Sequence, residues 1–159
     1  MFKAALIVLS DRAARGERED ACIPIMRERL GAAYEIVRAV VLPDDPGALQ
    51  AELIDLADTG AADLVLTSGG TGLAPRDRTP QATAAILDYE VPGIAEAIRA
   101  CSMRIVASAM LSRALAGVRH RTLIVNLPGS PKAVGESLDV IVATLPHALE
   151  LLAGGVTDG

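Results

Sequence analysis

Three short runs of almost uninterrupted apolar residues predict buried strands. They span residues 4–9, 63–67 and 122–127, and each ends in a polar or glycine-rich loop. Strands that are apolar on both faces are typical of a parallel sheet with helices on both sides. A fourth run, 34–42, alternates more between apolar and polar residues, which predicts a strand nearer the edge of the same sheet.

Helical patterns separate these runs. Three helices are predicted to begin at a cap residue followed by proline, at Asp45-Pro46, Thr79-Pro80 and Ser130-Pro131. The last of these has one apolar stripe from 134 to 152 and ends at Gly154 and Gly155. The segment 91–118 stays open, because 94–101 has a helical pattern whereas 105–115 fits either a strand or a helix.

Strands that alternate with helices predict a three-layer α/β/α sandwich with a mostly parallel central sheet. No composition shift, internal repeat or long linker divides the chain, so we expect residues 1–159 to form one domain. Ligands of such sheets bind beyond the carboxyl ends of the strands. The loops that follow the predicted strands are therefore the first places to look for chemistry.

Composition excludes several classes of function. The 159 residues carry a net charge of -5 and include one Phe, two Tyr and no Trp, so few rings could stack on bases and no nucleic-acid partner is expected. No apolar stretch approaches the roughly 20 residues that span a bilayer, and the first run is too short for a signal peptide. Cys22 and Cys101 form no metal or disulfide motif. We expect a cytoplasmic protein without a membrane partner.

The loop after 63–67 is rich in glycine and reads Thr67-Ser68-Gly69-Gly70-Thr71-Gly72. Three glycines in four positions allow backbone N–H groups to approach an anion such as phosphate. The spacing fits neither the dinucleotide-binding fingerprint nor the P-loop. A plain tight turn is the alternative interpretation.

Two carboxylates accompany this loop. Asp77 lies between Arg76 and Arg78, just ahead of a predicted helix, and Asp44 follows the run 34–42. Two carboxylates beside a phosphate-binding loop suit Mg²⁺, which takes one or two carboxylates together with phosphate oxygens and water. Asp44 can share a metal ion with Asp77 only if the two strand ends are adjacent in the sheet. Taken alone, Asp44 also fits a turn or a helix cap.

Two further polar loops are expected at the same edge of the sheet. Ser10-Asp11-Arg12 ends the first run, and the segment 126–132 reads Asn-Leu-Pro-Gly-Ser-Pro-Lys. The second combines a rigid turn with a helix N-terminus, whose free N–H groups could bind a second anion. Four polar loops are thus predicted to converge.

In this order the motifs resemble those of the molybdopterin adenylyltransferases, the MogA type within the MoaB/Mog domain group. The resemblance extends from residue 3 to about residue 153. It rests on Ser10-Asp11-Arg12, Pro43-Asp44, the segment 67–72, Arg76-Asp77, Thr79-Pro80, Ala82-Thr83, Pro92-Gly93, Leu111-Ser112-Arg113 and the segment 126–132.

The resemblance implies a domain, usually trimeric, that adenylylates molybdopterin with ATP and Mg²⁺ and releases pyrophosphate during molybdenum cofactor biosynthesis. It also implies hand-over of the product to a metal-insertion protein. Asp44 and Asp77 would be the catalytic residues and the Mg²⁺ ligands. The implied substrate-binding residues are Ser10, Asp11, Thr67, Gly69, Gly70, Thr71, Gly72, Arg76, Ser112, Arg113, Asn126, Pro128, Gly129, Ser130 and Lys132.

The sequence departs from the family's pattern at two places near the expected site. Gln81 stands where many members carry an acidic residue, and Ala21-Cys22 stands where the family usually has glycine before Ile23-Pro24. Two alternatives stay open. One is a non-catalytic molybdopterin-binding paralogue, against which Asp44 and Asp77 argue. The other is a pyrophosphohydrolase resembling the competence-damage domain, which usually departs from the Gly-Gly-Thr-Gly loop. The sequence does not distinguish a molybdenum from a tungsten pathway.

Overall fold

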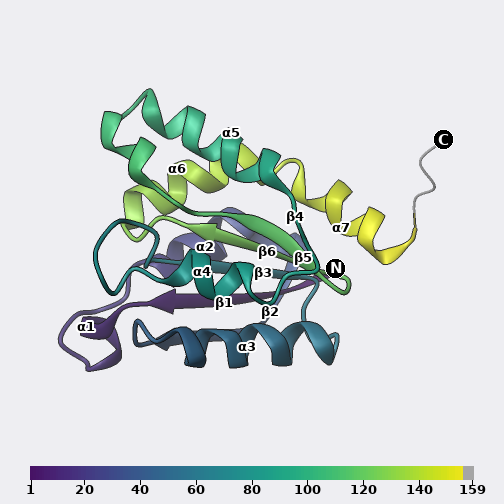
Figure 1. Ribbon diagram of the computed structural model, residues 1–159. Coiled ribbons are helices and arrows are strands. Elements are labelled where there is room, and N and C mark those ends of the chain that lie inside the picture. Colours follow the sequence, from purple (N-terminus) through teal and green to yellow (C-terminus); the bar gives the residue numbers. More distant parts are fainter. Residues whose placement is uncertain (156–159) are drawn as a thin grey trace.

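A six-stranded sheet forms the centre of the computed structural model, which describes residues 1–155 (Figure 1). Its strands are β1 (Phe2–Leu9), β2 (Tyr34–Leu42), β3 (Leu64–Ser68), β4 (Tyr89–Glu90), β5 (Ala116–Arg119) and β6 (Thr122–Leu127). The strand order is β2-β1-β3-β6-β5-β4. β1, β2, β3 and β6 run parallel, whereas β5 is antiparallel to both β6 and β4. The predicted mostly parallel sheet is confirmed, with β2 at an edge.

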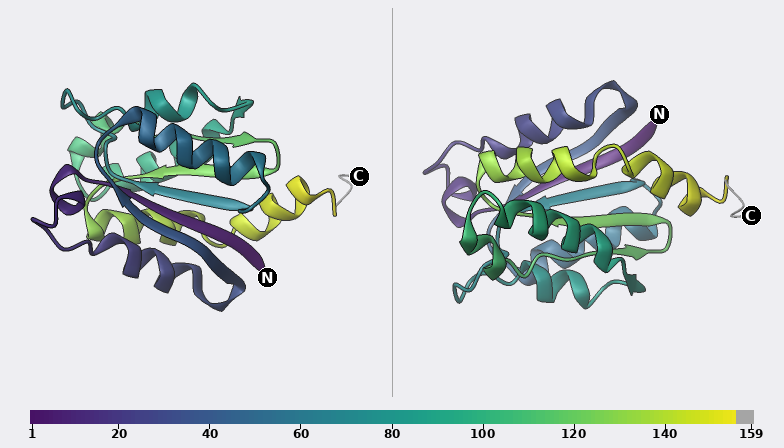
Figure 2. Two further views of the ribbon diagram at one scale, coloured as in Figure 1. Left: turned by 90° about the horizontal axis from the view of Figure 1, so that it is seen from below. Right: turned by 90° about the horizontal axis from the view of Figure 1, so that it is seen from above.

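Both faces of this sheet are covered by helices. α2 (Cys22–Leu30), α5 (Pro92–Met103), α6 (Pro131–Ile141) and α7 (Leu145–Ala153) contribute to the core on one face, and α3 (Pro46–Asp58) and α4 (Thr79–Ala84) to the core on the other. Figure 2 shows α3 in front of the sheet from below, and α5 and α6 in front from above. The short helix α1 (Asp11–Ala14) follows β1, and the 3₁₀ turns η1 (Gly31–Ala33) and η2 (Ala107–Leu111) lie in connections.

The strand sequences explain the two cores. In β1 the even-numbered residues from Ala4 to Val8 belong to one core, and the odd-numbered residues from Ala5 to Leu9 belong to the other. Successive side chains of a strand point to opposite faces, so a strand covered on both sides must be apolar at every position. The uninterrupted apolar runs are therefore a direct consequence of the three-layer arrangement.

The prediction of one helix from 131 to 153 is wrong, because the structure divides this segment into α6 and α7. Pro146 lies in the first turn of α7. It has no N–H to donate to the carbonyl of Val142, so an unbroken α-helix cannot pass through this point. The apolar stripe persists across the break, since Leu138 and Leu149 are both buried. Gly154 ends α7 in the left-handed conformation, as predicted.

The predicted helix starts are confirmed at all three positions, whereas only two of the three predicted cap residues form a capping hydrogen bond. The side chain of Asp45 accepts from the N–H of Gly47, and that of Ser130 accepts from the N–H of Ala133. Thr79 is not a cap, since it is the first residue of α4. Its side chain is buried and its N–H donates to the carbonyl of Gly70 at 3.1 Å, which ties the start of α4 to the glycine loop.

The open segment 91–118 contains α5, which includes the helical pattern at 94–101. Residues 105–115 form neither a strand nor an α-helix, because η2 occupies only Ala107–Leu111 and β5 begins at Ala116. Neither α2 nor β4 was predicted. Within residues 1–155 no helix is both long enough and apolar enough to cross a membrane.

Candidate functional site

The four polar loops converge as predicted. β1, β2, β3 and β6 run parallel, so the loops after them meet at one edge of the sheet. They line a cavity of about 350 Å³ that we call the acidic cavity. Its lining includes Ser10, Arg18, Glu19, Asp20, Cys22, Asp44, Ser68, Gly69, Gly70, Asp77, Gly129 and Ser130.

The glycine loop, residues 69–72, needs glycine for conformation and for close approach. Gly69 and Gly70 have φ angles of 98° and 68°, which side chains rarely adopt. A Cβ atom would collide with the Leu9 carbonyl oxygen at Gly69 and with the Thr79 hydroxyl at Gly70. The N–H of Gly69 donates to the carbonyl of Leu127. For the N–H groups from Gly70 to Gly72, residues 1–155 offer no acceptor. N–H groups of a glycine-rich turn without a partner in the protein are typical of anion-binding loops.

Asp44 and Asp77 both lie against the glycine loop. A Cβ atom at Gly70 would lie 3.5 Å from Oδ1 of Asp44, and one at Gly72 would lie 2.9 Å from Oδ2 of Asp77. Both residues line the acidic cavity. We had predicted that Asp44 and Asp77 could share a metal ion only if the ends of their strands were adjacent. This condition is wrong, because β1 lies between β2 and β3. The segment between β3 and α4 instead crosses the end of β1 and brings Asp77 toward Asp44.

Asp11 joins these loops from the end of β1. Its N–H donates to Oδ2 of Asp44 at 3.1 Å, and the N–H of Asp44 donates back to Oδ1 of Asp11 at 3.0 Å. Arg76 donates to both carboxylate oxygens of Asp11, with the Nη2–Oδ1 distance at 2.9 Å. Arg76 therefore pairs with Asp11 and not with its neighbour Asp77. The Arg76 guanidinium holds the pKa of Asp11 below its usual value.

Burial raises the pKa of Asp44, and the negative charges of Asp11 and Asp77 act in the same direction. The N–H of Asp11 opposes them by lowering it. A cation bound at this position would favour the ionised form of Asp44. The electrostatics of the acidic cavity thus suit a positively charged ligand beside the two carboxylates.

The donor set fits Mg²⁺ shared with a phosphate. In residues 1–155 no group of three or more His, Cys, Asp and Glu side chains could hold a metal ion. Two carboxylates with neighbouring anion-binding N–H groups match the preference of Mg²⁺ for few carboxylates, several waters and phosphate oxygens. Asp44 and Asp77 are the residues that would hold it.

Several residues of the acidic cavity were not predicted as site residues, among them Asp20, Cys22 and Ser68. Asp20 accepts from the N–H groups of Cys22 and Ile23 at 2.9 and 3.0 Å and so caps the first turn of α2. The Cys22 thiol donates to the carbonyl of Gly129, and the Ser68 hydroxyl donates to the carbonyl of Pro128. Both support the turn at 128–129. The sequence did offer one signal for Asp20, because an Asp shortly before a helix is typical of a capping residue. Gln81 is exposed in the first turn of α4 and lines neither cavity.

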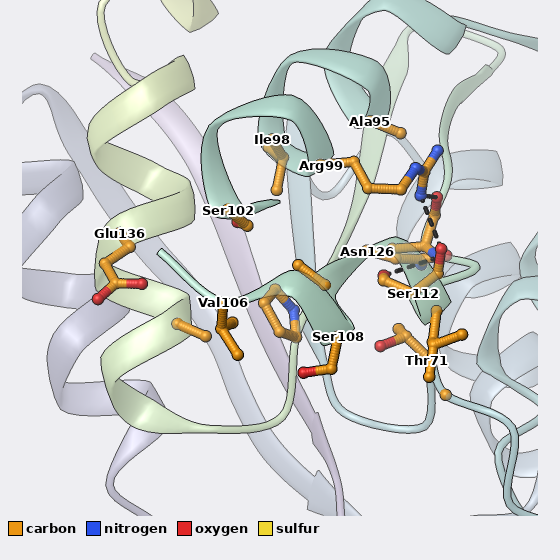
Figure 3. A pocket seen from close by; sticks show the side chains of 16 residues that line it. Thr71, Ala95, Ile98, Arg99, Ser102, Val106, Ser108, Ser112, Asn126 and Glu136 are labelled. Atoms are coloured by element: carbon orange, nitrogen blue, oxygen red, sulfur yellow. Dashed lines mark hydrogen bonds between the residues drawn. The ribbon is translucent and has the colours of Figure 1, made fainter. Parts of the chain in front are cut away.

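A second cavity of about 270 Å³ lies on the other side of the glycine loop (Figure 3). We call it the apolar cavity, because mostly apolar atoms line it and eight of its sixteen lining residues have apolar side chains: Ala95, Ile98, Val106, Ala109, Leu111, Ala114, Pro128 and Ala133. Arg99, Ser102, Ser108, Ser112 and Glu136 add polar groups. Gly69 and Gly70 line the acidic cavity, whereas Thr71 and Gly72 line the apolar cavity. The glycine loop is thus a shared wall.

Thr67 and Asn126 hold the elements around this wall together. The Asn126 side-chain amide donates to the hydroxyls of Thr67 and Thr83 at 2.9 and 3.1 Å. Its carbonyl accepts from the N–H of Leu115. All of Thr67, Thr83 and Asn126 are buried, so these bonds join β3, β6 and α4 in the interior.

The three predicted cations occupy different surroundings. Arg76 is paired with Asp11, as described, and Arg113 donates to the backbone carbonyls of Gly72 and Asp77. Lys132 is exposed and lines neither cavity, and its Nζ lies 3.8 Å from Oε1 of Glu136. Ser112 lines the apolar cavity, and its hydroxyl accepts from the N–H of Ala114.

Comparison with known proteins agrees with this geometry. Residues 5–147 match the family described as probable molybdopterin binding domain. The chain is 38% identical over 168 residues to the molybdopterin adenylyltransferase of Escherichia coli (strain K12), and the match covers 96% of this chain and 86% of that protein.

Solved structures show the same fold. The molybdopterin biosynthesis enzyme MoaB from Thermus thermophilus has a TM-score of 0.91 and 49% identity, over 97% of this chain and 98% of that chain. The molybdopterin biosynthesis Mog protein from Mycobacterium ulcerans has a TM-score of 0.89 and 41% identity, over 96% and 97%. Sequence, fold and the converging loops lead to one conclusion: this chain belongs to the family of probable molybdopterin binding domains.

Proposed function

We propose that this protein is a molybdopterin adenylyltransferase of molybdenum cofactor biosynthesis, which uses ATP and Mg²⁺ and releases pyrophosphate. The observation that carries the proposal is the placement of Asp44 and Asp77, from separate loops, against a glycine loop with free N–H groups. A protein that only bound the pterin would have no need for two carboxylates beside an anion site. The naming of the Escherichia coli relative as a molybdopterin adenylyltransferase supports the same activity.

The two cavities suit the two substrates. The apolar cavity would take the adenosine of ATP, because a purine ring is flat and largely apolar on its faces. The acidic cavity would take the phosphate end of molybdopterin, with Ser10, Gly129 and Ser130 in its wall. The phosphates of ATP would then lie across the glycine loop, in reach of the N–H groups from Gly70 to Gly72.

The reaction needs positioning and charge neutralisation. An oxygen of the terminal phosphate of molybdopterin attacks the α-phosphorus of ATP, a P–O bond forms, and the bond to pyrophosphate breaks. When bound, Mg²⁺ neutralises the charge that develops on the phosphates. Asp44 and Asp77 would hold that ion, and the N–H groups of the glycine loop would donate to phosphate oxygens. No side-chain nucleophile is required, and burial raises the pKa of the Cys22 thiol, which disfavours the thiolate.

A homotrimer in the cytoplasm, with hand-over of adenylyl-molybdopterin to a metal-insertion protein, completes the proposal. Apolar side chains that are about half exposed follow one another from the end of α5 through η2, as is typical of an interaction surface. They are Met103, Ile105, Val106, Met110 and Leu111. Light scattering should give about three times the 16.5 kDa of one chain, and a particle of 16.5 kDa would contradict the trimer.

Turnover tests the function directly. The purified protein is incubated with molybdopterin, ATP and Mg²⁺, and pyrophosphate is measured with and without each component. We expect release that depends on all three. Pterin binding without release would favour the non-catalytic paralogue, whereas hydrolysis of nucleotide pyrophosphates without the pterin would favour the pyrophosphohydrolase.

A further inference from the structure

Arg113 forms hydrogen bonds with the backbone of the segment that carries Asp77. Its N–H donates to the carbonyl of Thr71 at 2.8 Å, and its Nε donates to the carbonyl of Gly72 at 2.9 Å. A terminal guanidinium nitrogen donates to the backbone carbonyl of Asp77. One half-buried side chain thus spans both ends of the loop from Gly72 to Asp77.

This loop has few other attachments. Inside it, the N–H of Asp77 donates to the carbonyl of Ala74, and the N–H of Ala74 donates to Oδ2 of Asp77. Leu73 and Arg76 are exposed. Among residues 1–155, Arg113 and the pair between Arg76 and Asp11 provide the hydrogen bonds from residues 72–77 to other segments. Arg113 holds this loop at both ends, whereas the pair with Asp11 holds it at Arg76 alone.

The backbone on both sides of Arg113 is held by a second arginine. Arg99 on α5 donates to the carbonyls of Ser112 and Ala114, the two neighbours of Arg113, at 3.0 and 3.1 Å. Two arginines therefore act in series, from α5 to the segment 112–114 and from there to the loop with Asp77. The fork of a guanidinium suits two carbonyls at a fixed separation, which a single ammonium cannot reproduce.

We propose that Arg113 is a positioning residue that holds Asp77 toward the acidic cavity, and not a cation that binds a substrate phosphate. The inference rests on the proposed function. Two of its guanidinium nitrogens already donate to carbonyls of the protein, and the carboxylate of Asp77 lies close to Gly72, whose carbonyl Arg113 holds. Loss of these hydrogen bonds would let the carboxylate move away from the glycine loop.

The test compares Arg113→Lys, which keeps the charge and loses the fork, with Arg113→Ala. Amide hydrogen exchange of the unliganded protein should be faster at 71–78 in both variants and unchanged in β3. Turnover should fall by about 10²-fold in both, the loss expected from a small misplacement of a catalytic group. The Mg²⁺ concentration for half-maximal activity should rise, while the KM for ATP stays within about twofold.

Two further variants sharpen this result. In an Asp77→Asn background, Arg113→Lys should lower turnover little further, because both changes remove the same contribution. The control is Arg38→Ala. Arg38 on β2 forms ion pairs with Glu52 and Asp55 on α3, far from the glycine loop in sequence. Its loss should change neither amide exchange at 71–78 nor turnover.

Other results would overturn the inference. If Arg113→Lys keeps turnover while Arg113→Ala raises only the KM for ATP, Arg113 binds phosphate. If exchange at 71–78 is unchanged in Arg113→Lys, the hydrogen bonds of Arg113 do not hold the loop. The exchange measurement does not require catalysis, so an inactive wild-type protein would count against the proposed function while this measurement still tested Arg113.

Discussion

The two cavities on either side of the glycine loop differ in nearly every property. The acidic cavity is built from loops at the ends of four parallel strands and presents the carboxylates of Asp44 and Asp77. The apolar cavity is built from α5, η2 and α6 and presents mostly aliphatic carbon. The contrast shows how one short loop can separate two cavities of different character, because Gly69 and Gly70 line one cavity and Thr71 and Gly72 the other.

The division also separates affinity from chemistry. An apolar cavity binds a ring by burial, which acts equally on the ground state and the transition state. Charge that develops during phosphoryl transfer is stabilised only where donors and cations are already in place. Variants in the apolar cavity should therefore change the KM for ATP, whereas variants of the two carboxylates in the acidic cavity should change kcat.

The largest effect is expected at the two carboxylates. Asp44→Asn or Asp77→Asn should lower turnover by about 10²- to 10³-fold, as for loss of one strong electrostatic stabiliser, about 2.7–4 kcal/mol. Pterin binding should persist, since a repulsion toward its phosphate is relieved. Asp55→Asn, on α3, is the matched control and should leave turnover unchanged. Unchanged turnover in both site variants would remove the metal-site assignment.

Gly70→Val should have the next largest effect. Its φ of 68° is unfavourable for valine, and a Cβ atom would collide with the Thr79 hydroxyl. We expect the affinity for the pterin, measured by calorimetry, to fall by more than about tenfold, equivalent to about 1.4 kcal/mol. Gly47→Ala, in the first turn of α3 without such a clash, is the control. Affinity within twofold of wild type would place the pterin elsewhere.

Filling the apolar cavity should act on ATP alone. Ala95 on α5 is 7% exposed and lines the apolar cavity. Ala95→Leu would therefore fill part of the proposed nucleoside site. We expect the KM for ATP to rise by about three- to tenfold, a loss of about 1 kcal/mol, with pterin affinity unchanged. Ala51→Leu, exposed on α3, controls for the added side chain. A change in pterin affinity with a constant KM for ATP would exchange the two assignments.

The smallest effect concerns stability. Burial and two nearby carboxylates raise the pKa of Asp44, so its ionised form costs free energy in the folded state at neutral pH. Asp44→Asn should raise the Tm of the unliganded protein by up to about 2 °C, since about 1 kcal/mol shifts Tm by about 2–4 °C at this size and water screens part of the charge.

The pH dependence gives the sign of that effect. The cost is present above the raised pKa of Asp44 and disappears as pH falls through it, because the protonated carboxyl carries no charge. The difference in Tm between the variant and the wild type should therefore be largest near neutral pH and shrink under acidic conditions. A constant difference would mean that charge is not its cause.

The sequence predicted the acidic cavity much better than the apolar one. Local motifs such as Gly-Gly-Thr-Gly and Pro-Gly-Ser-Pro follow apolar strands, and parallel strands bring their ends to one edge. The apolar cavity has no such motif, because its residues resemble the core residues of α5 and α6. Its existence depends on how η2 packs, which periodicity does not indicate.

Contacts between residues far apart in sequence were also not predicted. Arg76 was predicted to bind substrate, but in the structure it pairs with Asp11, which is 65 residues away in sequence. The strand order placed β1 between β2 and β3, so the loop over β1 and not strand adjacency brings Asp44 and Asp77 together. By contrast, the break before α7 follows from Pro146, a local feature of the sequence.

A crystal structure with a non-hydrolysable ATP analogue and Mn²⁺ in place of Mg²⁺ tests the central claim most directly. We expect an anomalous peak for Mn²⁺ between the carboxylates of Asp44 and Asp77, and the adenine ring in the apolar cavity. Mn²⁺ bound away from both carboxylates, or adenine in the acidic cavity, would contradict the proposed site.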